Sequence, residues 1–211
     1  MPSSDSYLIV GGGLLGGHIV DLLLQRGEKS VAVFDLRPSS FDSRVKVYQG
    51  DLADPDAIGK AIKDVGTSFR NRCASMEEGL LADVPAFQSK VTCIIQTAAA
   101  LPGQPRFVHI KVNIEGTRNV IEQAQKHGVR KFVWTSSASV VFDGSDQDGV
   151  DETYPYPIHP VDDYSETKAT AEQLVLAANG QKRLSTCSLR VAGLFGYVGT
   201  TSLLVTVYHQ V

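Results

Sequence analysis

The sequence predicts an α/β fold in which a parallel, doubly wound β-sheet is covered by helices on both faces. Short apolar runs typical of strands alternate with longer segments of helical period. The segments between the strands are long enough for β-α-β units, which join parallel strands. Candidate strands such as Val31–Phe34 are apolar rather than alternating, as expected for strands buried on both faces.

Six strands are expected, at residues 7–10, 31–34, 45–48, 91–96, 131–135 and 185–189. Four long helices are expected, at residues 14–26, from Asp54 and Pro55 onward, at 107–127 and at 162–178. Asp54 is a candidate N-cap, and Pro55 suits the first helical position. Three of the helices end at a glycine, which is typical of a helix C-terminus: Gly27, Gly128 and Gly180.

Composition limits the class of protein. The chain has 211 residues, 43% hydrophobic and 20% charged, which corresponds to about 1.4 globular domains. A net charge of −3 gives no electrostatic basis for binding nucleic acid or an anionic membrane. The 3 cysteines lack the paired spacing of metal sites or disulfide frameworks and favour a reducing compartment. No apolar window is long enough to span a bilayer.

A glycine-rich turn follows the first predicted strand and opens the first helix. Gly11, Gly13 and Gly16 form the pattern GxGxxG, with Leu14 and Leu15 inside it. One glycine allows a tight turn, the next lets the backbone approach a pyrophosphate, and the last lets the helix pack on the strand. The N-terminus of the helix offers free N–H groups to the phosphates.

Asp35 ends the second predicted strand, where a carboxylate can hold the ribose hydroxyls of a dinucleotide. It favours NAD over NADP because a carboxylate repels a 2′-phosphate, whereas the nearby Arg37 argues the other way. These residues predict a Rossmann-like dinucleotide site. The alternative is a structural glycine turn that caps the helix.

Tyr164 and Lys168 form a YxxxK pair on the last predicted helix, where residues four apart share a face. The Lys168 ammonium is expected to lower the pKa of the Tyr164 phenol, so that tyrosinate exchanges a proton with an alcohol during hydride transfer. Ser137 follows the fifth strand, at the edge where open α/β sheets bind ligands. The alternatives are a surface Tyr–Lys pair and serines that merely end a strand.

Weaker signals follow the third and fourth strands. Asp51 is placed to contact an adenine, and the small residues Thr97 and Ala98 would let a cofactor lie close to the sheet edge; a turn and simple packing are the alternatives. Asn113 lies within a predicted helix, where asparagine is a poor former, which indicates a local hydrogen-bonding role. The five histidines lack metal-ligand spacing and are interpreted as surface or capping residues, and Trp134 as core.

These residues resemble the extended short-chain dehydrogenase/reductase family, and within it the 3-beta-hydroxysteroid dehydrogenase branch that includes sterol-4-alpha-carboxylate 3-dehydrogenases. The matching text is VNIEGTRNVIEQAQKHGVRKFVWTSSASVVFDG (112–144), DETYPYP (151–157) and DDYSETKATAEQLVLAANG (162–180). SSASVVFDG followed by DETYPYP is more specific than the general family motifs. The resemblance covers about residues 7–65 and 91–196.

The resemblance implies roles for individual residues. Ser137, Tyr164 and Lys168 would be the catalytic group, and Asn113 would support a proton relay. The residues implied to line NAD are Gly11, Gly13, Leu14, Leu15, Gly16, Asp35, Asp51, Leu52, Thr97, Ala98, Tyr164 and Lys168. In the sterol branch, oxidation of the 3-hydroxyl gives a ketone β to the 4-carboxylate, which then leaves as CO₂ with the ketone as electron sink.

Some features depart from the family pattern. Position 10 is Val where extended members begin GxxGxxG, and Val191 replaces a proline. Residues 66–90 have no counterpart, and the family chain continues well past Gly196. We therefore expect an NAD(P)-binding Rossmann domain at 1–196 with an atypical insertion at 66–90, a non-family tail at 197–211 and a truncated substrate-binding region. Translated intron or mispredicted exon sequence is one hypothesis for both segments; a genuine loop and a short variant is the other.

The expected function is an NAD-dependent oxidoreductase that oxidises the 3-hydroxyl of a sterol or steroid. The expected partners are this small-molecule substrate and a second copy in a homodimer, with no nucleic acid and no metal. The expected location is cytoplasmic, at the cytosolic face of the endoplasmic reticulum. The alternatives are a truncated, catalytically impaired NAD-binding module and an extended-family enzyme on another substrate, such as a nucleotide-sugar epimerase or a carbonyl reductase.

Overall fold

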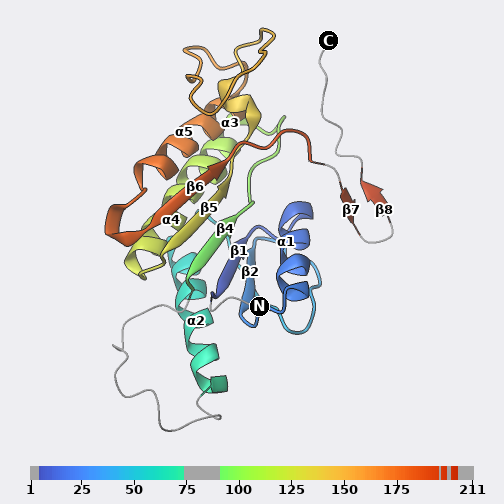
Figure 1. Ribbon diagram of the computed structural model, residues 1–211, viewed down its shortest axis with the longest axis vertical. Helices are drawn as coiled ribbons and strands as arrows, with labels where there is room; N and C mark the ends of the chain where they lie inside the picture. Colours follow the sequence, from blue (N-terminus) through green and yellow to red (C-terminus); the bar gives the residue numbers. More distant parts are fainter. Residues whose placement is uncertain (1–4, 74–90, 195, 199–200, 204–211) are drawn as a thin grey trace.

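The structure is a computed structural model that describes residues 5–73, 91–194, 196–198 and 201–203. At its centre is a six-stranded sheet with the order β3-β2-β1-β4-β5-β6, in which every pair of neighbouring strands is parallel (Figure 1). Its strands are β1 Tyr7–Val10, β2 Val31–Asp35, β3 Lys46–Gln49, β4 Cys93–Gln96, β5 Lys131–Thr135 and β6 Ser185–Leu189. The chain starts in the middle of the sheet and builds outward in both directions, which confirms the predicted doubly wound α/β fold.

The helices lie between the strands, as predicted, with one difference. They are α1 Leu14–Gln25, α2 Pro55–Cys73, α3 Arg106–His109, the π-helix Ile110–Gly116, α4 Thr117–Lys126 and α5 Asp163–Ala177, with short 3₁₀ helices at Ala138–Val141 and Gln181–Arg183. The single helix expected at 107–127 is therefore three consecutive elements with a π-helical centre. Asp54 caps α2 as predicted, since its carboxylate accepts hydrogen bonds from the N–H groups of Asp56 and Ala57.

The two faces of the sheet carry separate hydrophobic clusters. Leu8 and Val10 of β1 face a cluster that includes residues of α2, α4 and α5, whereas Tyr7 and Ile9 face a cluster that includes residues of α1 (Figure 1). Because successive strand residues point to opposite faces, both sides of β1 are buried, which confirms helices on both faces. Trp134 of β5 lies in the first cluster at 1% exposure, as predicted for a core residue.

Two predicted segments lie largely outside the described residues. The stretch 66–90 begins within α2, which continues to Cys73, and residues 74–90 are not among those described. In the tail, β7 Gly196–Val198 and β8 Thr201–Leu203 pair antiparallel, and residues 204–211 are not described. The insertion and the non-family tail therefore stay predictions. Within the described part of the chain, no helix combines the length and apolar character needed to cross a membrane.

The packing of the glycine turn against the helix gives a test of the fold. We expect Gly16→Ala to lower the free energy of unfolding by about 2–4 kcal/mol, because a cavity-free core has no space for an added methyl. A Cβ at Gly16 would lie 1.8 Å from the carbonyl oxygen of Gly11. Gly17 is the matched control, since a Cβ there meets nothing within 4 Å. Gly17→Ala should stabilise α1 by about 0.5–1 kcal/mol. Urea unfolding measures both, and equal effects would contradict the close packing at Gly16.

Candidate active site

The glycine turn joins the carboxyl ends of β1, β2 and β4. Gly11 has φ of +102°, and its N–H donates to the carbonyl of Phe34 at 2.8 Å. The Thr97 hydroxyl donates to the carbonyl of Gly11 at 2.8 Å. A Cβ on Gly11 would lie 2.5 Å from the amide nitrogen of Ala98, so this position accepts only glycine without rearrangement. Thr97 and Ala98 thus lie where the sequence predicts, beside the turn.

The N-terminus of α1 is open to an anion. Its N-cap is the exposed Gly13, where no side chain caps the helix and where a Cβ would meet nothing within 4 Å. No acidic residue lies in its first turn, which contains Leu14 and Leu15. The positive end of the helix dipole and its unpaired N–H groups are therefore available to a phosphate, which fits the predicted pyrophosphate site.

Asp35, at the end of β2, stabilises this glycine turn through a hydrogen bond to its side chain. One carboxylate oxygen accepts a hydrogen bond from the Gly12 N–H at 2.6 Å, and the other accepts from the Arg37 N–H at 2.7 Å. A carboxylate oxygen has a second lone pair, so each can also accept from a ribose hydroxyl. The half-buried side chain is thus fixed in direction and still open on one side.

The residues after β3 are held by the helices that follow β4. Asp51 forms an ion pair with Lys111 at 2.7 Å, and the Lys111 ammonium holds the pKa of the Asp51 carboxyl below its usual range. The Leu52 side chain packs in the core, and its carbonyl accepts a hydrogen bond from Asn119 at 2.9 Å. The buried side chain of Leu52 is therefore unavailable to a cofactor, which could contact only the Leu52 backbone. The side chain of Asp51, in contrast, lies at the surface of the site.

Asn113 connects two parts of the site. It lies in the π-helix Ile110–Gly116 and is fully buried. Its side-chain oxygen accepts from the Ala100 N–H at 2.9 Å, and its amide donates to the Thr167 hydroxyl of α5 at 3.1 Å. Short π-helical segments are rare and occur often at functional sites. The predicted hydrogen-bonding role of Asn113 thus links the loop after β4 to the helix that carries Tyr164.

Ser137 and Tyr164 lie together at the carboxyl end of β5. The Ser137 hydroxyl contacts the Ser139 hydroxyl at 2.8 Å and accepts a hydrogen bond from the Ser139 N–H. Burial raises the pKa of the Tyr164 phenol, and a hydrogen bond with Ser137 opposes this effect without cancelling it. The phenol is therefore protonated at neutral pH in this arrangement.

Lys168 lies deeper than the sequence suggests. Its side chain is 2% exposed, its ammonium donates to the carbonyl of Thr135 at 2.6 Å, and it sits 3.9 Å from the centre of the Trp134 ring. Burial lowers the pKa of Lys168 to about 7, although the Glu172 carboxylate opposes this. Burial is the largest effect on the pKa of Tyr164 in this arrangement, and the expected lowering of that pKa by the Lys168 ammonium stays a prediction.

Sequence reasoning missed three residues around the site. His109 was expected at the surface but is buried, with its ring edge-on to Tyr164 at 5.9 Å. Arg106 forms ion pairs with Asp163 and Glu166 at the start of α5. Glu172 is buried one turn beyond Lys168. The spacing of His109 and Asn113, four residues apart on one helical face, was a usable signal.

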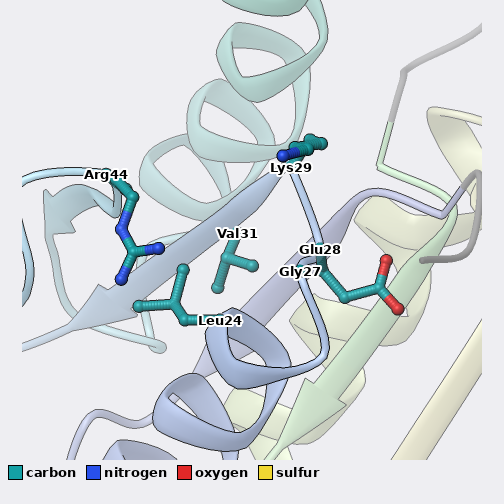
Figure 2. Close-up of a pocket in the computed structure, with 6 residues that line it drawn as sticks. All are labelled: Leu24, Gly27, Glu28, Lys29, Val31 and Arg44. Carbon is teal, nitrogen blue, oxygen red and sulfur yellow. The ribbon is translucent and has the colours of Figure 1, made fainter. Parts of the chain in front are cut away.

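A pocket elsewhere in the molecule does not belong to this site. It is lined by Leu24, Gly27, Glu28, Lys29, Val31 and Arg44 (Figure 2). These residues surround the end of α1 and the start of β2, so the pocket opens at the amino end of the strand. Ligands in such sheets bind at the opposite, carboxyl edge.

The sequence profile of the 3-beta hydroxysteroid dehydrogenase/isomerase family matches residues 81–211. The chain belongs to this family. A second profile, that of the NAD dependent epimerase/dehydratase family, matches residues 7–75. The resemblance noted in the sequence is thereby confirmed.

Curated relatives of this family member are longer proteins. The Candida albicans sterol-4-alpha-carboxylate 3-dehydrogenase, decarboxylating, is 36% identical over 205 residues, covering 92% of this chain and 52% of that protein. The Bos taurus protein of that name is 36% identical over 198 residues, covering 93% and 48%. A Mycobacterium tuberculosis 3 beta-hydroxysteroid dehydrogenase/Delta 5→4-isomerase is 35% identical over 192 residues, covering 90% and 47%. The chain spans about half the length of these relatives.

Solved structures share the fold. A Thermus thermophilus UDP-glucose 4-epimerase in complex with NAD superposes with a TM-score of 0.69 at 24% identity, covering 88% of this chain and 54% of that one. An Agrobacterium tumefaciens short-chain dehydrogenase/reductase superfamily protein with bound NAD gives 0.68 at 28% identity, covering 88% and 48%. The arrangement of sheet and helices in this family member is therefore that of the extended short-chain dehydrogenases.

The buried lysine makes stability depend on pH. The pKa of Lys168 is about 7 in the folded protein. An unfolded lysine has a pKa of about 10.4, so the unfolded state binds more protons between these values and stability rises with pH across this window. We expect the free energy of unfolding of wild type, relative to Lys168→Met, to increase by roughly 3–5 kcal/mol from about pH 7 to about pH 10.5.

The measurement is urea unfolding at a series of pH values. Lys126→Met, on the exposed side of α4, is the matched control and should show a constant difference from wild type. A constant difference for Lys168→Met as well would mean that folding does not lower the pKa of Lys168.

Proposed function

We propose that this chain carries the cofactor-binding and proton-transfer part of an NAD-dependent dehydrogenase that oxidises the 3-hydroxyl of a sterol or steroid. The observation that carries the proposal is that the predicted cofactor-binding residues and the predicted catalytic residues lie at the same edge of the sheet. The glycine turn follows β1, and Ser137, Tyr164 and Lys168 gather at the end of β5. Carboxyl ends of parallel strands form the ligand-binding edge of such sheets.

The residues present fit a dinucleotide. The open N-terminus of α1 at Gly13 would receive the pyrophosphate, and Asp35 would hold the ribose hydroxyls. Thr97 and Ala98 would lie beneath the cofactor at the sheet edge. When bound, the nicotinamide supplies the acceptor for the hydride. The carboxylate of Asp35 is the feature that favours NAD over NADP.

Tyr164 is the residue proposed to take the proton from the 3-hydroxyl. The Ser137 hydroxyl lowers the pKa of the nearby phenol and would also hold the substrate oxygen. Lys168, one turn along α5, supplies the positive charge that stabilises tyrosinate once the lysine side chain turns from Thr135 toward the phenol. His109 packs against the Tyr164 ring and limits its movement.

A sterol substrate is supported by relatives and by exposed apolar side chains. The C. albicans and B. taurus relatives are named for sterol-4-alpha-carboxylate dehydrogenation with decarboxylation. Phe107 of α3 and Ile158, which precedes α5, are 69% and 91% exposed, and α3 is joined to the start of α5 by the ion pairs of Arg106. Such side chains suit an apolar ring system. Oxidation at C3 of a 4-carboxysterol gives a β-keto acid, whose ketone accepts the electrons as CO₂ leaves.

A second candidate is a cofactor-binding module without turnover. It is favoured by the position of Lys168, whose ammonium donates to the Thr135 carbonyl, and by burial, which raises the pKa of the Tyr164 phenol. The homodimer and the location at the endoplasmic reticulum stay predictions.

Turnover of a tyrosine variant tests the proposal. We expect wild type to form NADH from NAD and a 3β-hydroxysteroid, and Tyr164→Phe to lower kcat by at least about 100-fold while NADH still binds, because only the proton acceptor is lost. NADH absorbance follows turnover, and NADH fluorescence follows binding. The control is Tyr154→Phe, at a 38% exposed tyrosine outside the site.

The outcomes separate the two candidates. Binding of NADH without turnover by wild type would leave the module and exclude the dehydrogenase for this chain. Turnover that survives Tyr164→Phe would exclude the proposed proton acceptor. Failure to bind NADH would contradict both candidates.

A further inference from the structure

A buried carboxylate lies one helical turn beyond Lys168. Glu172 of α5 is 1% exposed and accepts hydrogen bonds from two other segments of the chain, the one before α5 and the end of β6. The Tyr156 hydroxyl and the Ser188 hydroxyl each donate at 2.8 Å, and the Arg190 guanidinium donates twice, at 2.9 and 2.7 Å. We call these four residues the Glu172 cluster. A carboxylate that accepts this many hydrogen bonds can stay ionised without contact with water.

The charge on Glu172 follows from these contacts. Burial raises the pKa of its carboxyl, but the hydrogen bonds from Arg190, Tyr156 and Ser188 together outweigh burial and hold the pKa below its usual range. Glu172 is therefore an anion at neutral pH. An anion that is fixed by four hydrogen bonds is a stable source of negative potential for its neighbours.

The Lys168 ammonium needs a nearby negative charge to stay protonated in the protein interior. A buried ammonium loses its proton unless an opposite charge or strong hydrogen bonds stabilise it. On its own helix the titratable groups near it are Tyr164 and Glu172, four residues before and after it. From β5 it meets the Trp134 ring and the Thr135 carbonyl, which are neutral. From the β6 side, the Arg190 guanidinium is paired with Glu172. The Thr135 carbonyl and the Trp134 ring also favour the ammonium, but among these groups Glu172 is the one that favours it with a full negative charge.

We propose that Glu172 is a positioning residue for proton transfer, which keeps Lys168 protonated and in place at the end of β5. This inference rests on the proposed function, in which Lys168 acts beside Tyr164. We expect Arg190 to have the opposite effect, since a positive charge paired with Glu172 would partly cancel the potential of that carboxylate at Lys168. The cluster thus sets the charge of the lysine through the balance of an anion and a cation.

Titration of Lys168 tests this inference without cofactor or substrate. The full chain is labelled with ¹³C-lysine, and the Lys168 signal is assigned by its loss in Lys168→Met and followed by NMR against pH. Glu172→Gln keeps the size of the side chain and removes its charge, so we expect the pKa of Lys168 to fall by about one unit or more. Glu122→Gln, at an exposed position of α4, is the matched control and should leave the pKa unchanged. Glu172→Asp keeps the charge and should restore most of the wild-type value.

A second variant shifts the pKa in the opposite direction and carries the test if Glu172→Gln does not fold. Arg190→Gln leaves the carboxylate with its Tyr156 and Ser188 donors, so the pKa of Lys168 should rise above that of wild type. A role confined to holding α5 against β6 predicts no such rise. An unchanged or lower pKa in Arg190→Gln, or an unchanged pKa in folded Glu172→Gln, would overturn the inference.

The pH profile of turnover supplies the functional measurement. Because Lys168 must be protonated, activity is lost as pH rises through its pKa, and Glu172→Gln should move this alkaline limb of kcat/KM to lower pH. If wild type shows no turnover while the NMR shifts occur as expected, the proposed dehydrogenase function fails and the role of Glu172 stands. If turnover occurs but the limb and the NMR pKa do not move, the role of Glu172 fails alone.

Discussion

The hydrogen bonds of Asn113 are the interaction on which the arrangement of the site depends. Asn113 joins the Ala100 N–H, which follows β4, to the Thr167 hydroxyl on α5. The first of these segments continues from Thr97 and Ala98 beside the glycine turn, and the second carries Tyr164 and Lys168. One buried amide thus fixes the distance between the predicted cofactor side and the predicted proton-transfer side. The π-helix places this amide inward, since the extra residue of a π-turn changes which side chains face the sheet.

The sheet could be predicted from the sequence because its strands are local apolar runs. The expected strands at 7–10, 131–135 and 185–189 agree with β1, β5 and β6, and the others differ by one or two residues at an end. The edge strands β3 and β6 are only partly buried, whereas burial on both faces leaves a local apolar signal in β1 and β2. The same holds for α5, whose N-cap Asp162 accepts a hydrogen bond from the Ser165 N–H.

The parts that could not be predicted depend on contacts between distant segments. The π-helix within 107–127 has almost the apolar spacing of an α-helix, and it accompanies the two hydrogen bonds that Asn113 makes to segments outside its own helix. His109 is polar by type, and it is buried because α3 packs against α5 beside Tyr164. Lys168 shares a helix face with Tyr164 as the spacing requires, but its ammonium is bound by Thr135 on another element. Residue spacing predicts which face of a helix a side chain lies on, but it does not predict which group on another element that side chain binds.

Two helices that begin at the same edge of the sheet differ in how their N-termini are satisfied. The first turn of α5 has its own anions, since Asp162 caps it and Asp163 and Glu166 bind Arg106. The first turn of α1 has neither a capping side chain nor an acidic residue. A positive helix end without an internal anion favours an anion from outside, whereas a helix end that is already neutralised does not. This difference supports the proposal that the phosphates of a dinucleotide bind at α1, while α5 presents Tyr164 and Lys168. The division of roles between the two helices therefore follows from charge as well as from position in the sheet.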